Sequence, residues 1–455
     1  MQEDYFSFTN RLFDPSKIYE KPEVLKGIRV LDISHMIYGP NTAKILAQFG
    51  AEVIKVELPF YGDYWRTATY WGKFWKHSNP LWHFINHSKY FITIDVKKPK
   101  GRELILKLAK ISDVFIENFA PGTVEAWGIG YSQVSKINPK IIYVSLSTFG
   151  QFGPLKFQPG WDLIAQGVSG WMSVTGYPEI DSHYKIPDYL GDFYPSHFAV
   201  LLILAALFYR QKTGKGQYID LSQAEVLMRS LYHFTYETVT GKELGRTGNF
   251  DPTMVPSGIF KTSDGKFIAL AIATDEQFEA FCKAMGRVDL FKNDRFRNVL
   301  SRLKPENAKE LCEITKELIS SKTAFEIIDL AKKYGFSASE VMDDVKICND
   351  EWRRQRGSVV HFKDEMYGEF VLAGPIVMLS KTPGRIKWLS RPLGYHNRYV
   401  FMKLLGLSER EIKQLEKEGV IGYWDNRVGL KPPIGYDIEK DPVFNYKIDK
   451  EREKL

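Results

Sequence analysis

One βαβ unit near the start of the chain sets the fold class. Residues 27–34, Gly-Ile-Arg-Val-Leu-Asp-Ile-Ser, are typical of a buried strand, and residues 51–57 are typical of a second one. Between them lie a loop over residues 35–40 and a helical pattern over residues 41–49. Strands joined by one helix lie parallel with a right-handed crossover, and ligands of such sheets bind at the carboxyl ends of the strands. The loop at 35–40 is therefore a candidate site.

The alternation of strand and helix continues to about residue 150, which indicates an α/β fold with a Rossmann-like parallel sheet. Further strands are expected at residues 90–96, 113–119 and 140–147, and an amphipathic helix at 101–110. Beyond residue 225 the pattern changes to amphipathic helices around a short β segment. We therefore expect the N-terminal part of a large domain at residues 1–225 and a second, smaller domain at residues 226–350.

Several classes of function are disfavoured by composition and by missing motifs. The loop after the first strand has one glycine, Gly39, rather than G-x-G-x-x-G, which disfavours NAD, and no Walker A sequence occurs. Cys282, Cys312 and Cys348 lack the spacing of a metal site or a disulfide framework, so no metal is expected. The net charge of +7 comes from 62 basic and 55 acidic residues mixed along the chain, which disfavours nucleic-acid binding.

The sequence also gives an expectation for the compartment. The first residues are acidic and lack the basic and apolar regions of a signal peptide. No apolar run is long and uninterrupted enough to predict a transmembrane helix. Three widely spaced cysteines are typical of a reducing compartment. We expect a cytoplasmic protein without a membrane partner.

Asp192 has two interpretations at this stage. It precedes an apolar run at 198–208 that predicts a helix, and Pro195 suits the first turn of that helix. Asp192 is thus expected just before the helix, with Gly191 leaving its flank open and the positive helix end keeping the carboxylate ionised. It is either a helix cap or a carboxylate nucleophile, which must be ionised and reachable.

Two other features have less specific interpretations. Four tryptophans, Trp65, Trp71, Trp75 and Trp82, lie close together outside any periodic pattern. Such a group usually packs locally, and the alternative is a lid over a ligand. The tail from Trp424 is expected to extend along the surface.

A series of short motifs follows in a fixed order between residues 25 and 421. They are Gly27-Ile-Arg-Val-Leu-Asp-Ile, Gly39-Pro40, Leu46-Ala-Gln-Phe-Gly-Ala-Glu-Val-Ile-Lys-Val-Glu57, Gly62-Asp63 with Arg66, Asp95-Val-Lys97, Glu117-Asn-Phe-Ala-Pro-Gly122, Asn138-Pro139, Gly160-Trp-Asp-Leu-Ile-Ala-Gln166, Gly191-Asp192, Thr213-Gly-Lys-Gly-Gln217, Pro392-Leu-Gly-Tyr-His396 and the segment 407–421. No single motif is specific, but their order and spacing together resemble the class III CoA-transferases. This is the family of formyl-CoA transferase and carnitine CoA-transferase, with the α-methylacyl-CoA racemases as relatives.

The resemblance implies a fold, an assembly and a reaction. A small α+β domain is inserted into the large α/β domain, to which the C-terminal segment 351–455 returns, and two chains form an interlocked homodimer. The nucleophilic aspartate of the family falls on Asp192. CoA then passes from an acyl-CoA to a free carboxylic acid through an aspartyl anhydride and an aspartyl-CoA thioester. The substrates are CoA thioesters, and no permanently bound cofactor is implied.

The resemblance also places CoA and substrate contacts on particular residues. The matched positions are His35, Ile37, Tyr38, Ile94, Asp95, Lys97, Asn118, Phe119, Ala120, Trp161 and Asp162. Considered one by one, Ile94 and Phe119 favour strand-end packing, and Asn118 favours a turn cap. Asp162 matches an acidic position next to the reaction centre and is either a hydrogen-bonding helper or a helix cap. Leu58 and Ala126 stand where family members often carry arginine, so other cations such as Lys97 are expected at the phosphates.

Two alternatives to CoA transfer stay open. An acyl-CoA racemase of the same superfamily pairs a histidine with the aspartate, but Trp161 holds that position here, and indole is no base near neutral pH. A non-catalytic CoA-binding protein is the other alternative. Tyr38, Trp161, Phe193 and Tyr194 suggest an aromatic-walled pocket for an acid larger than formate. The glycine-rich lid of formyl-CoA transferase is not evident around residues 256–260, which argues against oxalate.

Overall fold

A computed structural model describes residues 4–68, 79–375 and 378–423, and within it the chain divides into two compact units. The large unit comprises the described residues of Met1–Ser169, Ile186–Leu231 and Asp350–Leu455, and the small unit comprises Gly170–Lys185 and Tyr232–Asn349. Residues 170–185 thus belong to the small unit, although the sequence analysis placed them in the large domain. The expectations for Trp71, Trp75 and the tail from Trp424 lie outside the described residues.

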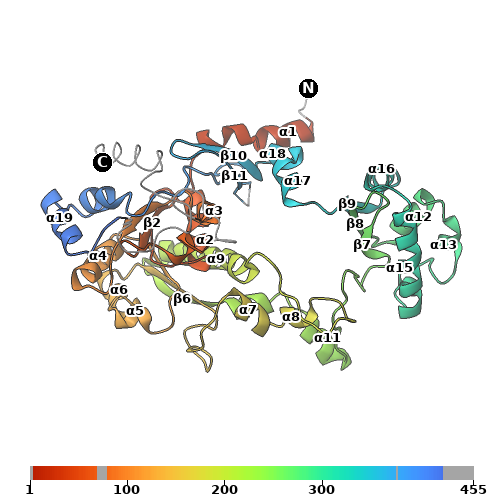
Figure 1. Ribbon diagram of the computed structural model, residues 1–455, viewed down its shortest axis with the longest axis horizontal. Coiled ribbons are helices and arrows are strands. Elements are labelled where there is room, and N and C mark those ends of the chain that lie inside the picture. The colour runs from red at the N-terminus through yellow and green to blue at the C-terminus, as the bar shows by residue number, and fades with distance from the viewer. Residues whose placement is uncertain (1–3, 69–78, 376–377, 424–455) are drawn as a thin grey trace. The chain divides into compact units, whose positions relative to one another are not determined.

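The large unit is built on a six-stranded sheet, of which β2 and β6 are labelled in Figure 1. The strand order is β3-β2-β1-β4-β5-β6, and every neighbouring pair is parallel. The strands are β1 (Arg29–Asp32), β2 (Glu52–Glu57), β3 (Tyr90–Thr93), β4 (Val114–Glu117), β5 (Ile142–Ser147) and β6 (Gln217–Ser222). This is the strand order of a doubly wound fold, and the order reverses between β1 and β4. The mixed α/β fold with a parallel sheet is therefore confirmed, and its switch point lies at the loops that follow β1 and β4.

Helices cover both faces of this sheet. Alternate residues along the strands point to opposite faces, so Leu31 packs into one apolar cluster and Val30 into the other. The first cluster draws on α4 (Pro99–Lys110), α5 (Thr123–Ala126), α6 (Tyr131–Ile137), the π-helical turn Tyr399–Leu404 and α19 (Glu409–Lys417). The second draws on α2 (Tyr38–Gln48) and α9 (Leu190–Thr213). The sheet is buried on both faces, as its nearly continuous apolar strands require.

Helix α2 begins three residues earlier than expected. The sequence predicts a loop over residues 35–40, but α2 starts at Tyr38. Proline at the third helical position needs no partner for its missing N–H, so Pro40 does not oppose the first turn. Gly39 is needed there because a Cβ atom would lie 2.2 Å from the Cβ atom of Ser34. The loop after β1 is therefore shorter and more tightly packed than the sequence indicates.

Helix α9 also begins earlier than expected, at Leu190, so that Asp192 lies in its first turn rather than before it and Pro195 lies inside the helix. Asp188 and Tyr189, with φ of 59° and 57°, turn the chain sharply into this helix. The length of α9 also corrects the expectation that no apolar run is long enough to predict a transmembrane helix. Among the described residues, α9 is long and apolar enough, by length and composition alone, to cross a membrane. Its inner side, with Ala199 and Ile203, packs against the sheet.

The C-terminal part of the large unit covers the free edge of β3. The N–H of Phe91 donates to Nδ1 of His396 at 2.9 Å, and the N–H of Thr93 donates to Oδ1 of Asn397 at 2.9 Å. A further backbone bond joins the N–H of Asp95 to the carbonyl of Val420 at 2.8 Å. The edge strand of the sheet thus has its polar groups satisfied by a segment from the far end of the chain.

The remaining elements of the large unit surround this core. They are α1 (Tyr5–Leu12), a 3₁₀ turn (Pro15–Glu20), a second 3₁₀ turn (Tyr64–Arg66), α3 (Pro80–Asn86), α7 (Asp162–Val168), α10 (Gln223–Met228), α18 (Glu351–Gln355) and the antiparallel pair β10 (Val359–Asp364) and β11 (Gly368–Ala373).

The small unit has its own apolar core. Its antiparallel sheet has the order β7-β8-β9, and helices α12, α15 and α16 supply half of the buried apolar side chains. Its elements are α8 (Trp171–Val174), α11 (His233–Thr240), β7 (Ser257–Lys261), β8 (Phe267–Ala271), α12 (Asp275–Ala284), α13 (Val288–Lys292), α14 (Val299–Arg302), α15 (Pro305–Ser320), α16 (Ala324–Tyr334), β9 (Ser337–Glu340) and α17 (Asp344–Asn349). This is the α+β composition expected for the second domain.

Candidate active site

Two cavities open at the carboxyl edge of the sheet in the large unit. The first cavity, of about 400 Å³, is largely apolar and is lined by the ends of β1 to β4. The Asp192 cavity, of about 490 Å³, is lined by the loops after β1, β4 and β5 together with Asp192 and Gln223. His35 and Phe119 line both cavities, and their rings meet edge to face with centroids 4.6 Å apart. The site therefore lies at the switch point of the sheet, where ligands of such folds bind.

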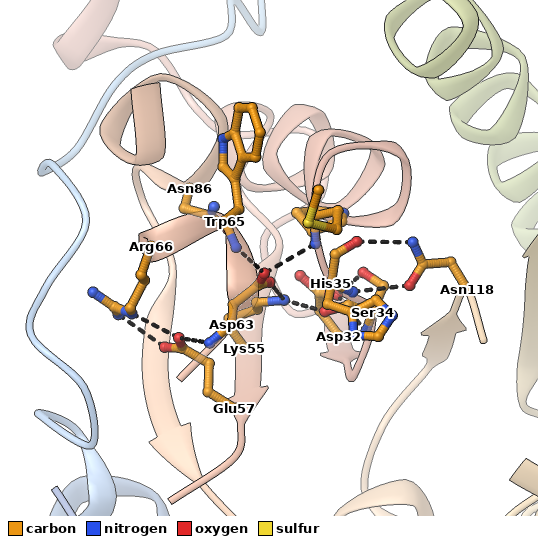
Figure 2. Close-up of polar contacts among 12 residues, drawn as sticks. Asp32, Ser34, His35, Lys55, Glu57, Asp63, Trp65, Arg66, Asn86 and Asn118 are labelled. Carbon is orange, nitrogen blue, oxygen red and sulfur yellow. Dashed lines mark hydrogen bonds and ion pairs between the residues drawn. The ribbon is translucent and has the colours of Figure 1, made fainter. Parts of the chain in front are cut away.

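The loop after β1 is held by side chains from other loops (Figure 2). Asn118 accepts from the N–H of His35 and donates to its carbonyl, both at 2.8 Å. Met36 has φ of 65°, which is unusual for a residue other than glycine, and its N–H donates to Oδ1 of Asp63 at 3.0 Å. These contacts fix the backbone between the two cavities in one conformation.

A buried group of three anions and three cations lies beneath this loop (Figure 2). Lys55 pairs with Asp63 at 2.9 Å and donates to the carbonyl of Ser34, while Lys89 pairs with Asp32 at 3.0 Å. Burial alone would raise the pKa of Asp32, but the two ammonium groups hold it below its ordinary value. Burying these charges is costly, and the cost is offset because each lies at contact distance from a group of opposite charge.

The third buried pair, Glu57 and Arg66, joins the end of β2 to the 3₁₀ turn at Tyr64–Arg66. Glu57 accepts from Nε of Arg66 at 2.6 Å and from a second guanidinium nitrogen at 2.8 Å. The guanidinium also lies over the ring of Trp82, with its carbon 4.3 Å from the ring centroid. Trp65 and Trp82, two of the four clustered tryptophans, are buried in a local apolar cluster, which is the packing role that was expected of them.

Asp192 faces its cavity from the first turn of α9. Its Oδ1 atom accepts from Nε2 of Gln223 at 2.6 Å, and its side chain is half-buried. Burial, followed by the negative charge of Asp162, raises the pKa of Asp192 to about 8, against the opposing effect of the Gln223 hydrogen bond. The carboxyl group lines the cavity and is held through one oxygen. Its raised pKa is opposite to the expectation that the positive helix end keeps it ionised, because burial and the charge of Asp162 disfavour the ionised form.

Asp162 lies behind Asp192 and does not line either cavity. Its Oδ1 atom accepts from the N–H of Gly191 at 2.6 Å, so that it caps α9 rather than its own helix. Both carboxylate oxygens also accept from Nε2 of Gln166, at 3.1 and 3.0 Å. Gly191 permits this approach, because a Cβ atom there would lie 2.8 Å from the carboxylate. The position of Asp192 thus depends on a cap from another helix.

The structure brings most of the predicted contact residues to these cavities. His35, Ile94, Asp95, Lys97 and Phe119 line the first cavity, and His35, Tyr38, Asn118, Phe119, Ala120 and Trp161 line the Asp192 cavity. Ile37 is buried beside Trp65 and does not reach either cavity. Phe193 packs on that same cluster, and Tyr194 donates to or accepts from Ser230 at 2.7 Å, so neither forms part of the cavity wall.

Sequence reasoning missed Gln223 and Thr148. Gln223 follows β6 and Thr148 follows β5, so both lie at the carboxyl ends of parallel strands. Their hydroxyl and amide groups bond each other at 2.8 Å. Applying the strand-end rule to every strand, rather than to the first one, would have identified both residues. Among the described residues, no group of three or more His, Cys, Asp or Glu side chains is placed to hold a metal ion.

Comparison with known proteins identifies the family. Residues 25–397 match the family described as "CoA-transferase family III". The chain is 33% identical to succinyl-CoA–D-citramalate CoA-transferase of Chloroflexus aurantiacus, over 88% of this chain and 98% of that protein. It is 31% identical to human succinyl-CoA:glutarate CoA-transferase, over 87% of this chain and 90% of that protein. The chain belongs to CoA-transferase family III, and is thus a class III CoA-transferase.

The fold agrees with solved structures of this family. A CAIB/BAIF family protein from Brucella suis superposes with a TM-score of 0.74 and 28% identity, over 84% of this chain and 99% of that one. The resemblance seen in the sequence motifs is therefore confirmed across most of the chain.

The buried charges beneath the loop give a first prediction. Lys55→Met keeps the length of the side chain but leaves Asp63 without its cation, so we expect the free energy of unfolding to fall by about 3–5 kcal/mol. Lys107→Met, which breaks an exposed pair with Glu103, should change it by less than about 1 kcal/mol. Urea denaturation of both variants measures the difference. If the free energy of unfolding falls equally in the two variants, the buried charges do not stabilise the fold more than an exposed ion pair does.

The pKa of Asp192 gives a second prediction. Aspartate in an unfolded chain has a pKa of about 3.9, whereas burial raises that of folded Asp192 to about 8. Between these values the folded protein binds more protons than the unfolded chain, so this group costs stability as pH rises. Asp192→Asn removes the titration. Its free energy of unfolding relative to wild type should therefore increase between about pH 4 and about pH 8 and then level off.

Asp188→Asn is the matched control for this measurement. Asp188 is exposed and lies in the turn before α9, at a positive φ that asparagine tolerates. Urea denaturation of both variants across the pH range separates the loss of a buried carboxyl from the loss of one charge. If the free energy of unfolding of Asp192→Asn relative to wild type does not change with pH, the carboxyl of Asp192 is not desolvated in the folded protein.

Proposed function

We propose that this protein transfers CoA from an acyl-CoA to a dicarboxylic acid, with Asp192 as the nucleophile. The observation that carries the proposal is the Asp192 carboxyl group in a cavity at the switch point of the sheet, where Oδ1 is held by Gln223 and Oδ2 has no hydrogen-bond partner among the described residues. A nucleophile must be reachable and fixed in direction, and a carboxylate with one bonded oxygen meets both requirements.

The reaction proceeds by exchange at three carbonyl carbons, those of the donor, of Asp192 and of the acceptor. Oδ2 of Asp192 attacks the thioester carbonyl of the donor, the carbon–sulfur bond breaks, and a mixed anhydride and a CoA thiolate form. The thiolate attacks Cγ of Asp192, the bond from Cγ to Oδ2 breaks, and the donor acid leaves as its carboxylate. The acceptor carboxylate displaces the thiolate from the aspartyl-CoA thioester. The thiolate then attacks the acceptor carbonyl and releases Asp192.

The neighbouring first cavity suits the nucleotide end of CoA. Its apolar lining includes Ile94 and Trp127, which provide contacts for a flat base, and Lys97 lies exposed at its edge as a cation for the phosphates. Leu58 lines the same cavity in place of the arginine that is common in the family. His35 and Phe119 line both cavities, so a CoA molecule bound in the first cavity would lie next to the Asp192 cavity.

The acceptor class is inferred from the relatives and from one lysine. Citramalate and glutarate, which the names of two relatives specify as acceptors, are both dicarboxylates, and both names specify succinyl-CoA as the donor. Lys156 lines the Asp192 cavity, where its ammonium group is available to the distal carboxylate of such an acid. The aromatic side chains of Tyr38 and Trp161 give the cavity walls for the carbon chain.

Asp192→Asn tests the nucleophile. Because an amide is a far poorer nucleophile, CoA transfer from succinyl-CoA to a panel of dicarboxylates should fall by a factor of about 10⁴ or more. CoA binding, followed by thermal shift, should survive. Hydroxylamine added with succinyl-CoA should convert Asp192 of the wild type to a hydroxamate, visible as a mass shift on its peptide.

Asp188→Asn changes the same peptide and should keep the wild-type rate. An active Asp192→Asn variant, with its sequence confirmed after the assay to exclude deamidation, would refute the covalent mechanism. If the wild type accepts monocarboxylates but no dicarboxylate, the covalent mechanism stands and the proposed class of acceptor is wrong.

We also infer a homodimer. The outer side of α9 exposes large apolar side chains, including Leu201 (60% exposed) and Phe208 (59% exposed), which a second copy would cover. The protein should sediment as a dimer at micromolar concentration and resist dissociation on dilution. Leu201→Lys should weaken this association, whereas a change at exposed Lys107 should not. A wild-type monomer under these conditions would contradict the inference.

A further inference from the structure

We propose that Gln223 is a catalytic hydrogen-bond donor, which stabilises the oxyanion formed each time Cγ of Asp192 is attacked. This inference rests on the proposed covalent function of Asp192 and assigns the donor that the reaction needs at this carbon. Its basis is the geometry of a chain of hydrogen bonds that runs from buried Thr148 through buried Gln223 to half-buried Asp192.

The contact between Gln223 and Asp192 is short and enclosed. Nε2 of Gln223 lies 2.6 Å from Oδ1 of Asp192, and the glutamine is 4% exposed. Gln223 is the first residue of α10 and follows β6 directly, so its backbone is fixed by the sheet. A donor that is already in place needs no reorganisation when charge develops on the oxygen it faces.

The orientation of the amide is set by Thr148. The Thr148 hydroxyl donates to Oε1 of Gln223 at 2.8 Å, so the NH₂ group is the end of the amide that faces Asp192. The carbonyl of Thr148 in turn accepts from the Ser222 hydroxyl at 2.8 Å and from the N–H of Ala224 at 3.2 Å. Thr148 and Gln223 are therefore both anchored at the ends of the neighbouring strands β5 and β6.

The bonded oxygen is the one that keeps its place on Asp192 during the reaction. With Oδ1 held by Gln223, Oδ2 forms the bond to the donor acyl group, and Oδ1 becomes the carbonyl oxygen of the anhydride. When the CoA thiolate attacks Cγ, the π electron pair moves onto Oδ1, and collapse expels the donor carboxylate with Oδ2. The acceptor carboxylate later attacks the same carbon and again places negative charge on Oδ1. One N–H thus serves both steps.

A second consequence concerns the resting enzyme. The hydrogen bond from Gln223 favours the ionised form of Asp192, while burial and Asp162 favour the protonated form. Removing the donor should therefore raise the pKa of Asp192 and move the acid limb of kcat/KM to higher pH. A glutamine that only fills space and supports packing would not affect this limb.

Gln223→Met is the direct test, because methionine has a similar length and no N–H. With succinyl-CoA and the best dicarboxylate, kcat should fall about 10²–10³-fold, the usual effect of losing one oxyanion donor. KM for the CoA ester should change little, and the acid limb should move to higher pH. Formation of the aspartyl-CoA thioester from succinyl-CoA alone, followed by acid quench and mass spectrometry, should slow by the same factor.

A matched pair at Thr148 tests the orientation without altering Gln223. Thr148→Val removes the hydroxyl and frees the amide to turn its oxygen toward Asp192, so it should slow turnover and shift the acid limb in the same direction. Thr148→Ser keeps the hydroxyl, so its turnover rate and the position of its acid limb should match those of the wild type. If Gln223→Met fails to fold, this pair still decides the question.

The outcomes separate this inference from the proposed function. If the wild type forms the Asp192 hydroxamate, while Gln223→Met and Thr148→Val keep its kcat and pH profile, the role of Gln223 is wrong and the nucleophile stands. If the wild type transfers no CoA and forms no hydroxamate, the proposed function fails, and the inference fails with it.

Discussion

The structure depends on the loop at residues 33–37, which joins β1 to α2 at the switch point of the sheet. This loop contains no glycine, and it must be held in one conformation. Met36 has a positive φ, and the adjoining carbonyl of Ser34 points into the protein. Both are fixed by the buried pair of Lys55 and Asp63, through the N–H of Met36 and the carbonyl of Ser34. Buried charges are costly unless paired, so the network is stable only when the loop closes on it. The ion pairs and the loop conformation therefore require each other.

The same constraint reaches Asp192 through two helices. The loop leads directly into α2, and the carbonyl of Tyr38 in its first turn accepts from the Ser196 hydroxyl at 2.9 Å. Ser196 lies one turn after Asp192 in α9 and also bonds the carbonyl of Asp192 at 2.7 Å. The wall of the Asp192 cavity and the first turn of α9 thus meet at one hydroxyl, whose single proton is shared between the carbonyls of Tyr38 and Asp192. The loop cannot shift without moving the carboxylate.

The sequence predicts the sheet well because each strand carries a local apolar pattern, and the family motifs placed Asp192 and most cavity residues. It fails where distant residues decide the local structure. The early start of α9 depends on the cap from Asp162, 29 residues away, and on two residues of positive φ that are not glycine. The links from Gln223 to Asp192 and to Thr148 span 31 and 75 residues. Neither link leaves a periodic signal, so only three-dimensional packing reveals them.

The covering of β3 by the C-terminal segment has a consequence for how the protein is made. Thr93 bonds Asn397, which is synthesised 304 residues later. Until then, the sheet formed by the N-terminal half carries an open edge with unpaired N–H and carbonyl groups, which is a template for pairing with other chains. A nascent or truncated chain that stops before this segment is therefore exposed to aggregation even if its apolar core is already formed. Production of this protein depends on rapid completion of the chain, independently of the stability of the finished fold.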